Sequence, residues 1–446
     1  MKRGIFSLKL ILFGAGEFGK KAIKFYGSDS VECYADNDLL KADTVFCGKK
    51  VIGFDKLTEI YSEFDVVISM DRISALQVSA QLDEAGISHY IWSPLTKSLD
   101  LNMLKSIPKI FAKMSDDISR IIFECRIMRF ITDEPAYIIK MVRSLHPQFD
   151  LLLSRLGNRR LFLCGTSSFE ISFAALNRDN MYGYVDIDNS HNMRNGGDLQ
   201  IQGLPFYSLS YACNCSSGIF MLPFVDKAKH RLVSDELKKM SIPESQIFDP
   251  MPYYRLDEAY FDLPQMQAVK DEVFVDAGAY DGETTKQFIK WANNQCADIR
   301  KIYAFEPDKD LYNICKAELN DIPCAYIENM GLWNTSDTLS FQVRPDGAST
   351  VSESGDDFIR VVSLDEHLGD ERVTFIKMDI EGAEVNALKG AREIIKKYKP
   401  KLAISIYHNH EDIITIPVTI HKINPSYRFY IRHYTLGTAD SVLYAL

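Results

Sequence analysis

The sequence predicts an α/β protein with a seven-stranded, mostly parallel sheet in its last two fifths, preceded by two repeated α/β units and a helical connector. Three observations support this fold class. Apolar runs of strand type alternate with helical patterns after residue 265. Glycine-rich turns join a strand to a helix near residues 14 and 278. The order of motifs near the N-terminus returns about 150 residues later.

Length, charge and cysteine usage limit the classes of protein. A chain of 446 residues is long enough for two to four domains. Its net charge of -10, without a clustered basic run, argues against a nucleic-acid partner. The nine cysteines include no C-x-x-C pair, so we expect reduced thiols and a cytoplasmic protein. No apolar run approaches the roughly 20 residues that cross a bilayer, and the apolar start Ile5–Phe13, interrupted by Lys9, predicts a buried strand rather than a signal peptide.

Residues 1–92 carry the pattern of a Rossmann-like unit. Lys9–Phe13 predicts a strand, a G-x-G-x-x-G turn opens a helix, and Val31–Ala35 predicts a second strand that ends in Asp36. Such a turn and helix N-terminus favour a pyrophosphate, so a nucleotide or nucleotide sugar is one of two expectations for this unit. The alternative is that the glycines only permit close helix–sheet packing in a docking or scaffolding unit. The candidate nucleotide-binding residues are Gly14, Gly16, Gly19 and Asp36.

The same order of motifs returns in the second quarter of the chain. Residues 160–165 align with 9–14, and residues 184–188 align with 34–38. In the second copy the turn is G-T-S-S-F-E, so only the first of the three glycines remains. We therefore expect a degenerate Rossmann-like unit over 158–250 whose ligand site is altered or lost.

Between the repeats, residues 93–157 show no strand pattern. Apolar residues at three- and four-residue spacing predict helices in Leu101–Met114 and Ile118–Ile131. Such faces form a core or a subunit contact, so we expect a helical connector that contributes to a homodimer. Prolines in Ile242–Leu263 predict an irregular bridge into the last domain, which we place at 251–446.

The last domain alternates strands and helices, as a parallel sheet with helices on both faces requires. The predicted main strands are 273–277, 301–306, 324–328, 374–379, 401–407, 427–434 and 440–445. The predicted helices are 283–294, 309–320, 383–398 and 411–423, with short strands near 339–343 and 358–362. Only about five residues separate the last two main strands, too few for a crossover helix, so these strands must pair antiparallel.

Three of these strands end in acidic motifs. The motifs are V-D-A-G-A-Y-D-G (275–282), Y-A-F-E-P (303–307) and I-K-M-D-I-E-G (376–382). Open parallel sheets bind ligands outside the carboxyl ends of their strands, so these acids should converge. Glu306, at the end of the second strand, suits a ribose diol because a carboxylate accepts two hydrogen bonds.

These motifs, together with D-G-A-S-T (346–350) and S-L-D (363–365), resemble the class I S-adenosylmethionine-dependent methyltransferases, and most closely the FkbM family. Members of that family mostly methylate hydroxyl oxygens of sugars and natural products. The resemblance runs from about residue 265 to the C-terminus. It implies a class I methyltransferase sheet, S-adenosylmethionine as cofactor, and O-methylation of a sugar, glycan precursor or related natural product.

The resemblance also implies which residues bind the cofactor. The first motif would surround the methionine part of S-adenosylmethionine, Glu306 would hold the ribose hydroxyls, and Asn329 would border the adenine. The cofactor-binding candidates are Asp276, Gly278, Ala279, Tyr280, Gly282, Thr284, Glu306, Pro307, Asp308 and Asn329. Thr284 and Asp308 have alternative roles as helix caps. Ser349, in D-G-A-S-T, is expected in a lid loop that contacts substrate or cofactor.

Displacement at a sulfonium methyl needs a group that orients the attacking oxygen and takes its proton. Asp379 is the first candidate, and Glu381 flanks it. Where many family members place a glutamate near one histidine, this chain has S-I-Y-H-N-H-E-D (405–412), so His408 is a second candidate base. Glu384, one turn into the next helix, is expected to favour the helix N-terminus. Two histidines one residue apart point to opposite sides of a strand, so no metal is expected.

Two other functions remain open. The first unit could bind a nicotinamide or nucleotide sugar and carry a redox step, although no Tyr-x-x-x-Lys pair follows Gly19. The chain could instead be a non-catalytic scaffold with an inherited pocket, although three convergent carboxylates would serve no purpose there. The expected partners are a small-molecule or saccharide acceptor and a second copy of the chain, with no nucleic acid and no membrane span.

Overall fold

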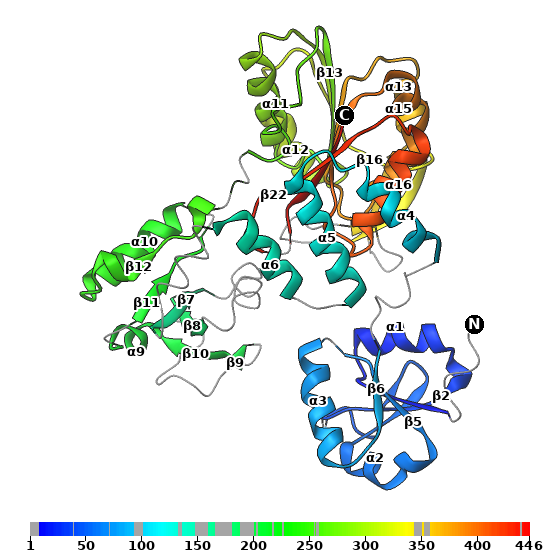
Figure 1. Cartoon of the computed structure of the whole chain (residues 1–446), viewed down its shortest axis with the longest axis vertical. Coiled ribbons are helices and arrows are strands. Elements are labelled where there is room, and N and C mark those ends of the chain that lie inside the picture. Colours follow the sequence, from blue (N-terminus) through cyan, green and yellow to red (C-terminus); the bar gives the residue numbers. More distant parts are fainter. Residues whose placement is uncertain are drawn as a thin grey trace. The chain divides into compact units, whose positions relative to one another are not determined.

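The structure is a computed structural model, and it describes residues 9–38, 40–70, 72–92, 101–132, 136–147, 159–165, 181–187, 200–201, 204–215, 218–224, 227–253, 255, 258–342, 350–351, 357–437 and 439–446. Ser349 and the altered turn of the second repeat lie outside these residues. The chain divides into two compact units, Met1–Leu104 and Lys105–Leu446, whose elements are labelled in Figure 1. Among the described helices, none is long and apolar enough to cross a membrane.

The first unit is a six-stranded sheet in the order β3-β4-β2-β1-β5-β6. Its strands are β1 (Leu10–Phe13), β2 (Val31–Ala35), β3 (Val45–Phe46), β4 (Lys49–Ile52), β5 (Asp65–Ile68) and β6 (His89–Ile91). Its helices are α1 (Glu17–Tyr26), α2 (Phe54–Ile60) and α3 (Arg72–Glu84). Both faces of the sheet bury apolar residues, as expected for a sheet with helices on both sides.

The second α/β region repeats this topology strand for strand. Its order, β12-β11-β7-β8-β10-β9, becomes that of the first sheet when each strand number is lowered by six and the row is reversed. Its strands are β7 (Arg160–Cys164), β8 (Met181–Asp186), β9 (Gln200–Ile201), β10 (Leu204–Ser208), β11 (Gly218–Met221) and β12 (Ile247–Phe248). The helices described there are α9 (Leu209–Cys213) and α10 (Lys227–Lys239). The repeat predicted from the sequence is therefore confirmed at the level of fold.

The C-terminal region forms a seven-stranded sheet in the order β15-β14-β13-β20-β21-β23-β22. Its strands are β13 (Glu272–Ala277), β14 (Ile299–Phe305), β15 (Ala325–Glu328), β20 (Phe375–Met378), β21 (Lys401–Ser405), β22 (Phe429–His433) and β23 (Ser441–Ala445). All neighbours pair parallel except β23, which is antiparallel to both β21 and β22. Counted along the chain the order is 3-2-1-4-5-7-6, and the predicted antiparallel hairpin is present.

Helices cover both faces of this sheet, with α11 on one side and α15 and α16 on the other (Figure 1). The helices are α11 (Glu283–Asn294), α12 (Lys309–Glu318), α13 (Leu364–Leu368), α14 (Glu384–Gly390), α15 (Arg392–Tyr398) and α16 (Asp412–Ile423). The prediction of one helix over 383–398 is wrong, because the chain breaks it at Ala391. Gly390, the last residue of α14, packs against the backbone of Trp333: a Cβ on Gly390 would lie 2.0 Å from the carbonyl oxygen of Trp333.

A second, four-stranded sheet, which the sequence patterns revealed only in part, lies beside the main one. Its strands, in the order β16-β19-β17-β18, are β16 (Gly331–Leu332), β17 (Asp337–Gln342), β18 (Thr350–Val351) and β19 (Asp357–Val362). Phe341, Ile359 and Val361 form its apolar cluster.

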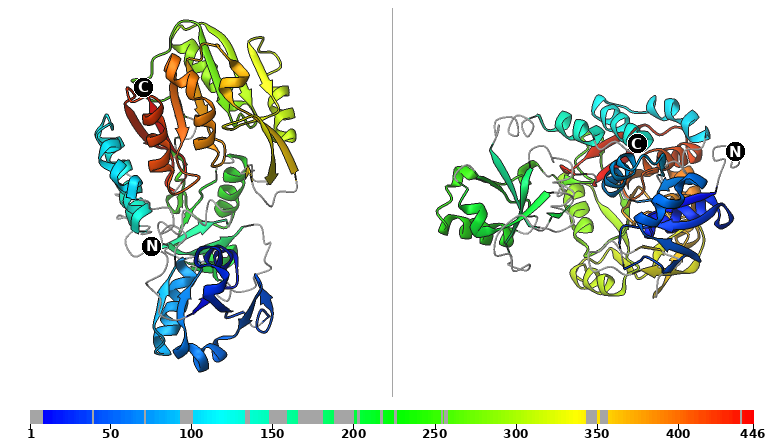
Figure 2. Two further views of the ribbon diagram at one scale, coloured as in Figure 1. Left: turned by 90° about the vertical axis from the view of Figure 1, so that its right-hand side faces the viewer. Right: turned by 90° about the horizontal axis from the view of Figure 1, so that it is seen from below.

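Helices α4 (Leu101–Phe111), α5 (Asp117–Thr132) and α6 (Ala136–Leu145) follow the last strand of the first sheet. Helix α5 packs against β22, the edge strand of the seven-stranded sheet, and both views of Figure 2 show the cyan helices beside the red C-terminal segment. The backbone N–H of Ile431 donates to the hydroxyl of Ser119 (2.8 Å), and Arg432 forms an ion pair with Asp116 (2.6 Å). The helix thus covers an edge that would otherwise expose unpaired backbone groups.

Candidate functional site

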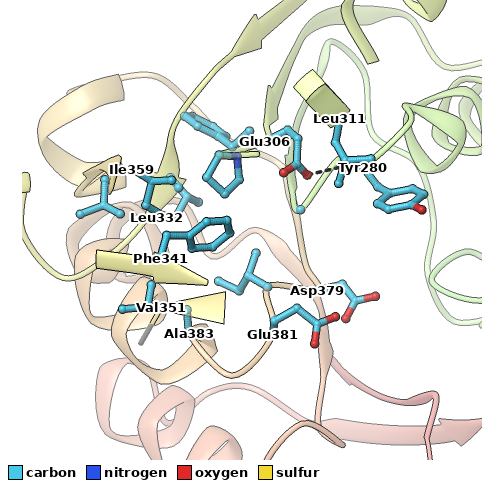
Figure 3. A pocket seen from close by; sticks show the side chains of 16 residues that line it. Tyr280, Glu306, Leu311, Leu332, Phe341, Val351, Ile359, Asp379, Glu381 and Ala383 are labelled. Atoms are coloured by element: carbon cyan, nitrogen blue, oxygen red, sulfur yellow. Dashed lines mark hydrogen bonds between the residues drawn. The ribbon is translucent and has the colours of Figure 1, made fainter. Parts of the chain in front are cut away.

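A cavity of about 290 Å³ opens at the carboxyl ends of β13, β14 and β20. The strand order reverses here, because β14 lies on one side of β13 and β20 on the other, and open parallel sheets bind their ligands at such points. Figure 3 shows Glu306 at one edge of the cavity and Asp379 with Glu381 at another. The apolar wall includes Leu311, Leu332, Phe341, Val351, Ile359 and Val361.

The turn after β13 lets the backbone of Gly278 touch the turn after β20. Gly278 has a φ of +76°, and a Cβ there would lie 1.9 Å from the carbonyl oxygen of Asp379. The buried ammonium of Lys377 donates to the Gly278 carbonyl (2.7 Å) and forms an ion pair with Asp276 (3.1 Å). The Thr285 hydroxyl donates to the other carboxylate oxygen of Asp276 (2.8 Å). Asp276 therefore fixes the turn from inside the protein and does not line the cavity.

Glu306 follows β14 and lines the cavity, although only 6% of the residue is exposed. Its two carboxylate oxygens accept the backbone N–H groups of Tyr280 and Asp308, each at 2.9 Å. Burial raises the pKa of Glu306 to about 7, even though these two N–H groups act in the opposite direction. A carboxylate oxygen has more than one lone pair, so Glu306 can still accept hydrogen bonds from a pair of ligand hydroxyls.

Two other predicted cofactor residues tie down the loop beside Glu306. Asp308 caps α12 by accepting two of its first backbone N–H groups, at 2.9 and 3.2 Å. The amide of Asn329 donates to the carbonyl oxygens of Glu306 (2.9 Å) and Pro307 (3.1 Å). Of these residues only Glu306 and Pro307 line the cavity, so Asp308 and Asn329 hold the loop in place.

The remaining predicted cofactor residues build the turn after β13. Gly278 and Tyr280 line the cavity. Ala279 is buried and belongs to a small apolar cluster. Gly282, with a φ of +86°, is the N-cap position of α11, and Thr284 lies in the first turn of that helix.

Asp379 is the centre of a hydrogen-bond network at the other edge of the cavity. Its Oδ2 accepts the hydroxyl of Tyr260 (2.7 Å), and its Oδ1 accepts the hydroxyl of Tyr407 (3.2 Å). His408 Nε2 lies 3.2 Å from Oδ1 and 3.5 Å from a carboxylate oxygen of Glu381. The Asp379 side chain nevertheless remains 26% exposed, so it is accessible from the cavity.

In this network, hydrogen bonds and neighbouring charges outweigh the effect of burial on the pKa of Asp379 and of His408. Burial alone would raise the pKa of Asp379, but the hydrogen bond to His408 and the charges of His408 and Lys377 hold it well below its usual range. Burial alone would lower the pKa of His408, but hydrogen bonds to Asp379, Glu381 and Glu384 raise it well above its usual range. At neutral pH the network therefore contains an ionised Asp379 beside a protonated His408.

Glu384 contacts the other ring nitrogen of His408. One of its oxygens lies 2.9 Å from His408 Nδ1 and also accepts the backbone N–H of Ile380 (2.9 Å). The Glu384 side chain is 1% exposed. It thus fixes the histidine and the loop after β20, besides lying at the N-terminus of α14.

Asp379, Glu384 and His408 have the composition of a metal site, because each offers one ligand atom within 4.8 Å of the others. A histidine that binds a metal must be neutral. Hydrogen bonds to three carboxylates favour the protonated ring instead. His408 lies at hydrogen-bond distance from Glu384 and Asp379 in this structure, and the absence of a metal requirement stays a prediction.

Two residues that line the cavity have a positive φ, which is uncommon for residues other than glycine. Tyr280 has a φ of +52° and Glu381 a φ of +53°. Such strain persists only where the surrounding structure fixes it, and it collects at ligand sites. These two residues lie on two different turns of the cavity, one after β13 and one after β20.

Three residues of the site were not predicted from the sequence. Lys377 lies within the motif 376–382, and a lysine inside an apolar strand could have indicated a buried ion pair. Tyr407 lies in the segment 405–412, but only the histidines there drew attention. Tyr260 lies in the region expected to be an irregular bridge, and no local pattern connects it with Asp379.

In the first unit, two of the three predicted nucleotide-binding glycines, Gly14 and Gly19, have packing roles. A Cβ on Gly14, whose φ is +118°, would lie 2.7 Å from the carbonyl oxygen of Ser69. A Cβ on Gly19 would lie 2.1 Å from the carbonyl oxygen of Gly14. Gly16, by contrast, has no described neighbour within 4 Å of such an atom and occupies the N-cap position of α1.

Asp36 is occupied by partners from its own unit. Its carboxylate accepts the backbone N–H groups of Ala15 (2.8 Å) and Asp38 (2.9 Å), and Lys41 pairs with it at 3.1 Å. Burial alone would raise the pKa of Asp36, but these partners bring it below its usual value. The contacts favour packing over ligand binding at this turn, and a nucleotide there stays a prediction.

The residues that surround this cavity are similar to a known family of methyltransferase domains. Residues 276–428 match the model of the methyltransferase FkbM domain. We refer to this matched region as the FkbM domain. The FkbM domain thus contains Glu306, Asp379 and His408, whereas Tyr260 and the helices α4 to α6 lie outside the matched residues.

Solved structures of methyltransferases are similar to this chain at low sequence identity. The methyltransferase FkbM from Methylobacillus flagellatus KT is 18% identical, with 99% of this chain and 90% of that chain covered and a TM-score of 0.45. Fibrillarin from Aeropyrum pernix, solved with natively bound S-adenosyl-L-methionine, is 9% identical, with 42% and 71% covered and a TM-score of 0.28. A SAM-dependent methyltransferase from Aquifex aeolicus is 14% identical, with 47% and 96% covered and a TM-score of 0.27. Among curated proteins, none matches this chain.

Proposed function

We propose that this protein is an S-adenosylmethionine-dependent O-methyltransferase whose acceptor is a hydroxyl of a sugar, glycan precursor or related natural product. The observation that carries the proposal is the cavity where the strand order of the seven-stranded sheet reverses, because Glu306 and Asp379 both line it. The hydroxyl acceptor follows from the tendency of the family that the motifs resemble.

The lining of the cavity fits the chemical parts of the cofactor. Glu306 would accept hydrogen bonds from the ribose diol. The apolar wall around Leu332 and Phe341 would receive the adenine. The carboxylates of Asp379 and Glu381 favour a nearby positive charge, which the sulfonium of S-adenosylmethionine carries. When bound, the cofactor supplies an electrophilic methyl group to an oxygen nucleophile.

Asp379 is the residue we propose for orienting the acceptor hydroxyl. It stays ionised at neutral pH, it is accessible from the cavity, and Tyr260 and Tyr407 fix its position. An ionised carboxylate accepts the hydrogen bond of a hydroxyl and can take its proton as the methyl group moves. His408 cannot act as a base while it is protonated, so its role is to hold Asp379 in position.

The experiment measures methyl transfer and cofactor binding separately. Methyl transfer to a panel of monosaccharides and sugar phosphates is followed as S-adenosylhomocysteine formation, and S-adenosylmethionine binding is followed by calorimetry. Asp379→Asn should lower the rate by about 100-fold or more, whereas S-adenosylmethionine affinity should fall only by about threefold, because Glu381 still offers a carboxylate to the sulfonium. Asp370→Asn, an exposed surface change, is the matched control. An Asp379→Asn variant with the native rate would remove Asp379 from the mechanism.

A further inference from the structure

The two carboxylate oxygens of Asp379 have different sets of partners. Oδ1 accepts the hydroxyl of Tyr407 (3.2 Å) and lies 3.2 Å from His408 Nε2. Oδ2 accepts the hydroxyl of Tyr260 at 2.7 Å, whereas the Tyr407 hydroxyl is 3.5 Å away from it. Each carboxylate oxygen offers about two lone pairs. Among the residues that the structure describes, both places on Oδ1 are therefore taken, and Oδ2 keeps one place for a further donor.

The hydroxyl of Tyr260 acts on Asp379 as a donor. It also lies 3.2 Å from the hydroxyl of Ser405. A phenol has a single proton, and the shorter contact assigns that proton to Asp379, so Ser405 donates to the Tyr260 oxygen. Burial and the charge of Asp379 raise the pKa of Tyr260 well above its usual value, so the phenol keeps its proton.

The seven-stranded sheet fixes Tyr260 at several points. Its side chain packs against the apolar cluster that contains Leu263 and Phe274. Its backbone N–H donates to the hydroxyl of Tyr444 in β23 (2.9 Å). The ammonium of Lys377 in β20 lies 5.4 Å from the centre of its ring. Backbone, ring and hydroxyl are therefore each held by a separate contact.

Tyr260 reaches Asp379 from outside the region that matches the FkbM model. That region is 276–428, and it contains Tyr407 and His408, the partners of Oδ1. The last side-chain torsion of an aspartate is soft. Without a donor on Oδ2, the carboxylate would be free to turn and to direct its open lone pair away from the cavity.

We propose that Tyr260 is a positioning residue for methyl transfer, and that it holds Asp379 so that Oδ2 is the oxygen that receives the acceptor hydroxyl. This inference rests on the proposed function, because it names the atom that takes the acceptor's proton. As the acceptor oxygen gains the methyl group, its proton passes to Oδ2, and the electron pair of the broken bond stays on the sulfur of the cofactor. A turned carboxylate would slow this step without weakening cofactor binding.

The test compares Tyr260→Phe with Tyr427→Phe in the full chain. Tyr427 is the matched control, because its hydroxyl donates to the carbonyl oxygen of Pro400 (2.6 Å) at the other end of β21. S-adenosylhomocysteine formation is measured with the monosaccharide panel and with methanol, a small hydroxyl probe. Tyr260→Phe should lower kcat about tenfold or more and leave S-adenosylmethionine affinity near the native value, because Asp379 is still present. Tyr427→Phe should keep the native kcat.

A double-mutant cycle separates positioning from a general structural effect. In an Asp379→Asn background, Tyr260→Phe should lower kcat by no more than about twofold, because no carboxylate is left to orient. The same cycle on the protein without cofactor, followed by denaturant-dependent hydrogen exchange in β20 and β21, tests the contact itself. The stability lost in Tyr260→Phe should be smaller in the Asp379→Asn background than in the native one.

Two results would overturn the inference: a native kcat in Tyr260→Phe, or a loss of kcat from Tyr260→Phe that is equal in both backgrounds. If Tyr260→Phe does not fold, Ser405→Ala takes its place, since it removes the donor to the phenol oxygen. It should lower kcat about threefold, and a native kcat would equally overturn the inference. Failure of the proposed function appears separately, as a native protein that forms no S-adenosylhomocysteine with any acceptor.

Discussion

The first unit and the FkbM domain contain the same local device with different surroundings. In both, an acid at the end of the second strand accepts one backbone N–H from the turn after the first strand and one from the residue two positions ahead. Asp36 accepts from Ala15 and Asp38. Glu306 accepts from Tyr280 and Asp308 in the same manner. The difference lies in what else each carboxylate meets.

Asp36 is neutralised by Lys41, and its pKa lies below the usual value. Glu306 faces a cavity instead, and burial raises its pKa to about 7. In both regions, the acid at the end of the second strand therefore fixes the glycine turn through backbone hydrogen bonds, whether or not a ligand binds there. The turn becomes a ligand site only where the carboxylate keeps lone pairs directed at open space.

The largest expected difference concerns the two lysines that serve these turns. Lys377→Met leaves Asp276 buried without its ion-pair partner and should cost about 3–5 kcal/mol. Lys41→Met removes a partner that is 41% exposed and should cost about 1 kcal/mol or less. Denaturant-dependent hydrogen exchange of peptides from each unit measures both changes. Equal losses would contradict the contrast between a buried and a solvent-screened pair.

The glycines give the next contrast. Gly278→Ala places a Cβ against the Asp379 carbonyl at a positive φ, and we expect a loss of about 3 kcal/mol in the FkbM domain. Gly16→Ala meets open space, so stability should change by less than about 1 kcal/mol. Thermal unfolding of the two variants makes the comparison. A large loss in Gly16→Ala would show that the first turn is packed more tightly than its geometry indicates.

A smaller effect should appear in the pH dependence of ligand binding. In the proposed function Glu306 binds the ribose diol as a carboxylate. A ligand must then displace the proton of Glu306 once the pH falls below about 7, whereas above that pH no proton is released. Affinity for 5′-methylthioadenosine, which carries the ribose but no titrating amino group, should be about tenfold weaker at pH 6 than at pH 8. Asp36→Asn should show the same profile as the native protein. A flat native profile would remove Glu306 from the ribose site.

Much of the fold could be predicted from the sequence because strand and helix periodicity are local. The antiparallel final hairpin followed from its short connection, and the meeting of Glu306 with Asp379 followed from the rule on strand ends. The break at Ala391 could not be predicted, because it depends on how Gly390 packs against a distant strand end.

The parts of the site that depend on long-range packing were beyond prediction. Tyr260 reaches Asp379 across 119 residues, and its backbone reaches Tyr444 across 184. Neither contact has a motif, because the partners are set only by how the bridge packs on the finished sheet. For Asp276 the motif predicted a ligand contact, and this prediction is not supported by the structure. Its side chain forms an ion pair with Lys377 and accepts a hydrogen bond from Thr285 instead.

The most direct test of the central claim is calorimetry of S-adenosylmethionine with the native protein, Glu306→Gln and Asp36→Asn. We predict one-site binding to the native protein, about 100-fold weaker binding to Glu306→Gln because charged hydrogen bonds to the ribose are lost, and native affinity for Asp36→Asn. A native protein that does not bind, or a Glu306→Gln variant that binds as tightly as the native protein, would contradict the account.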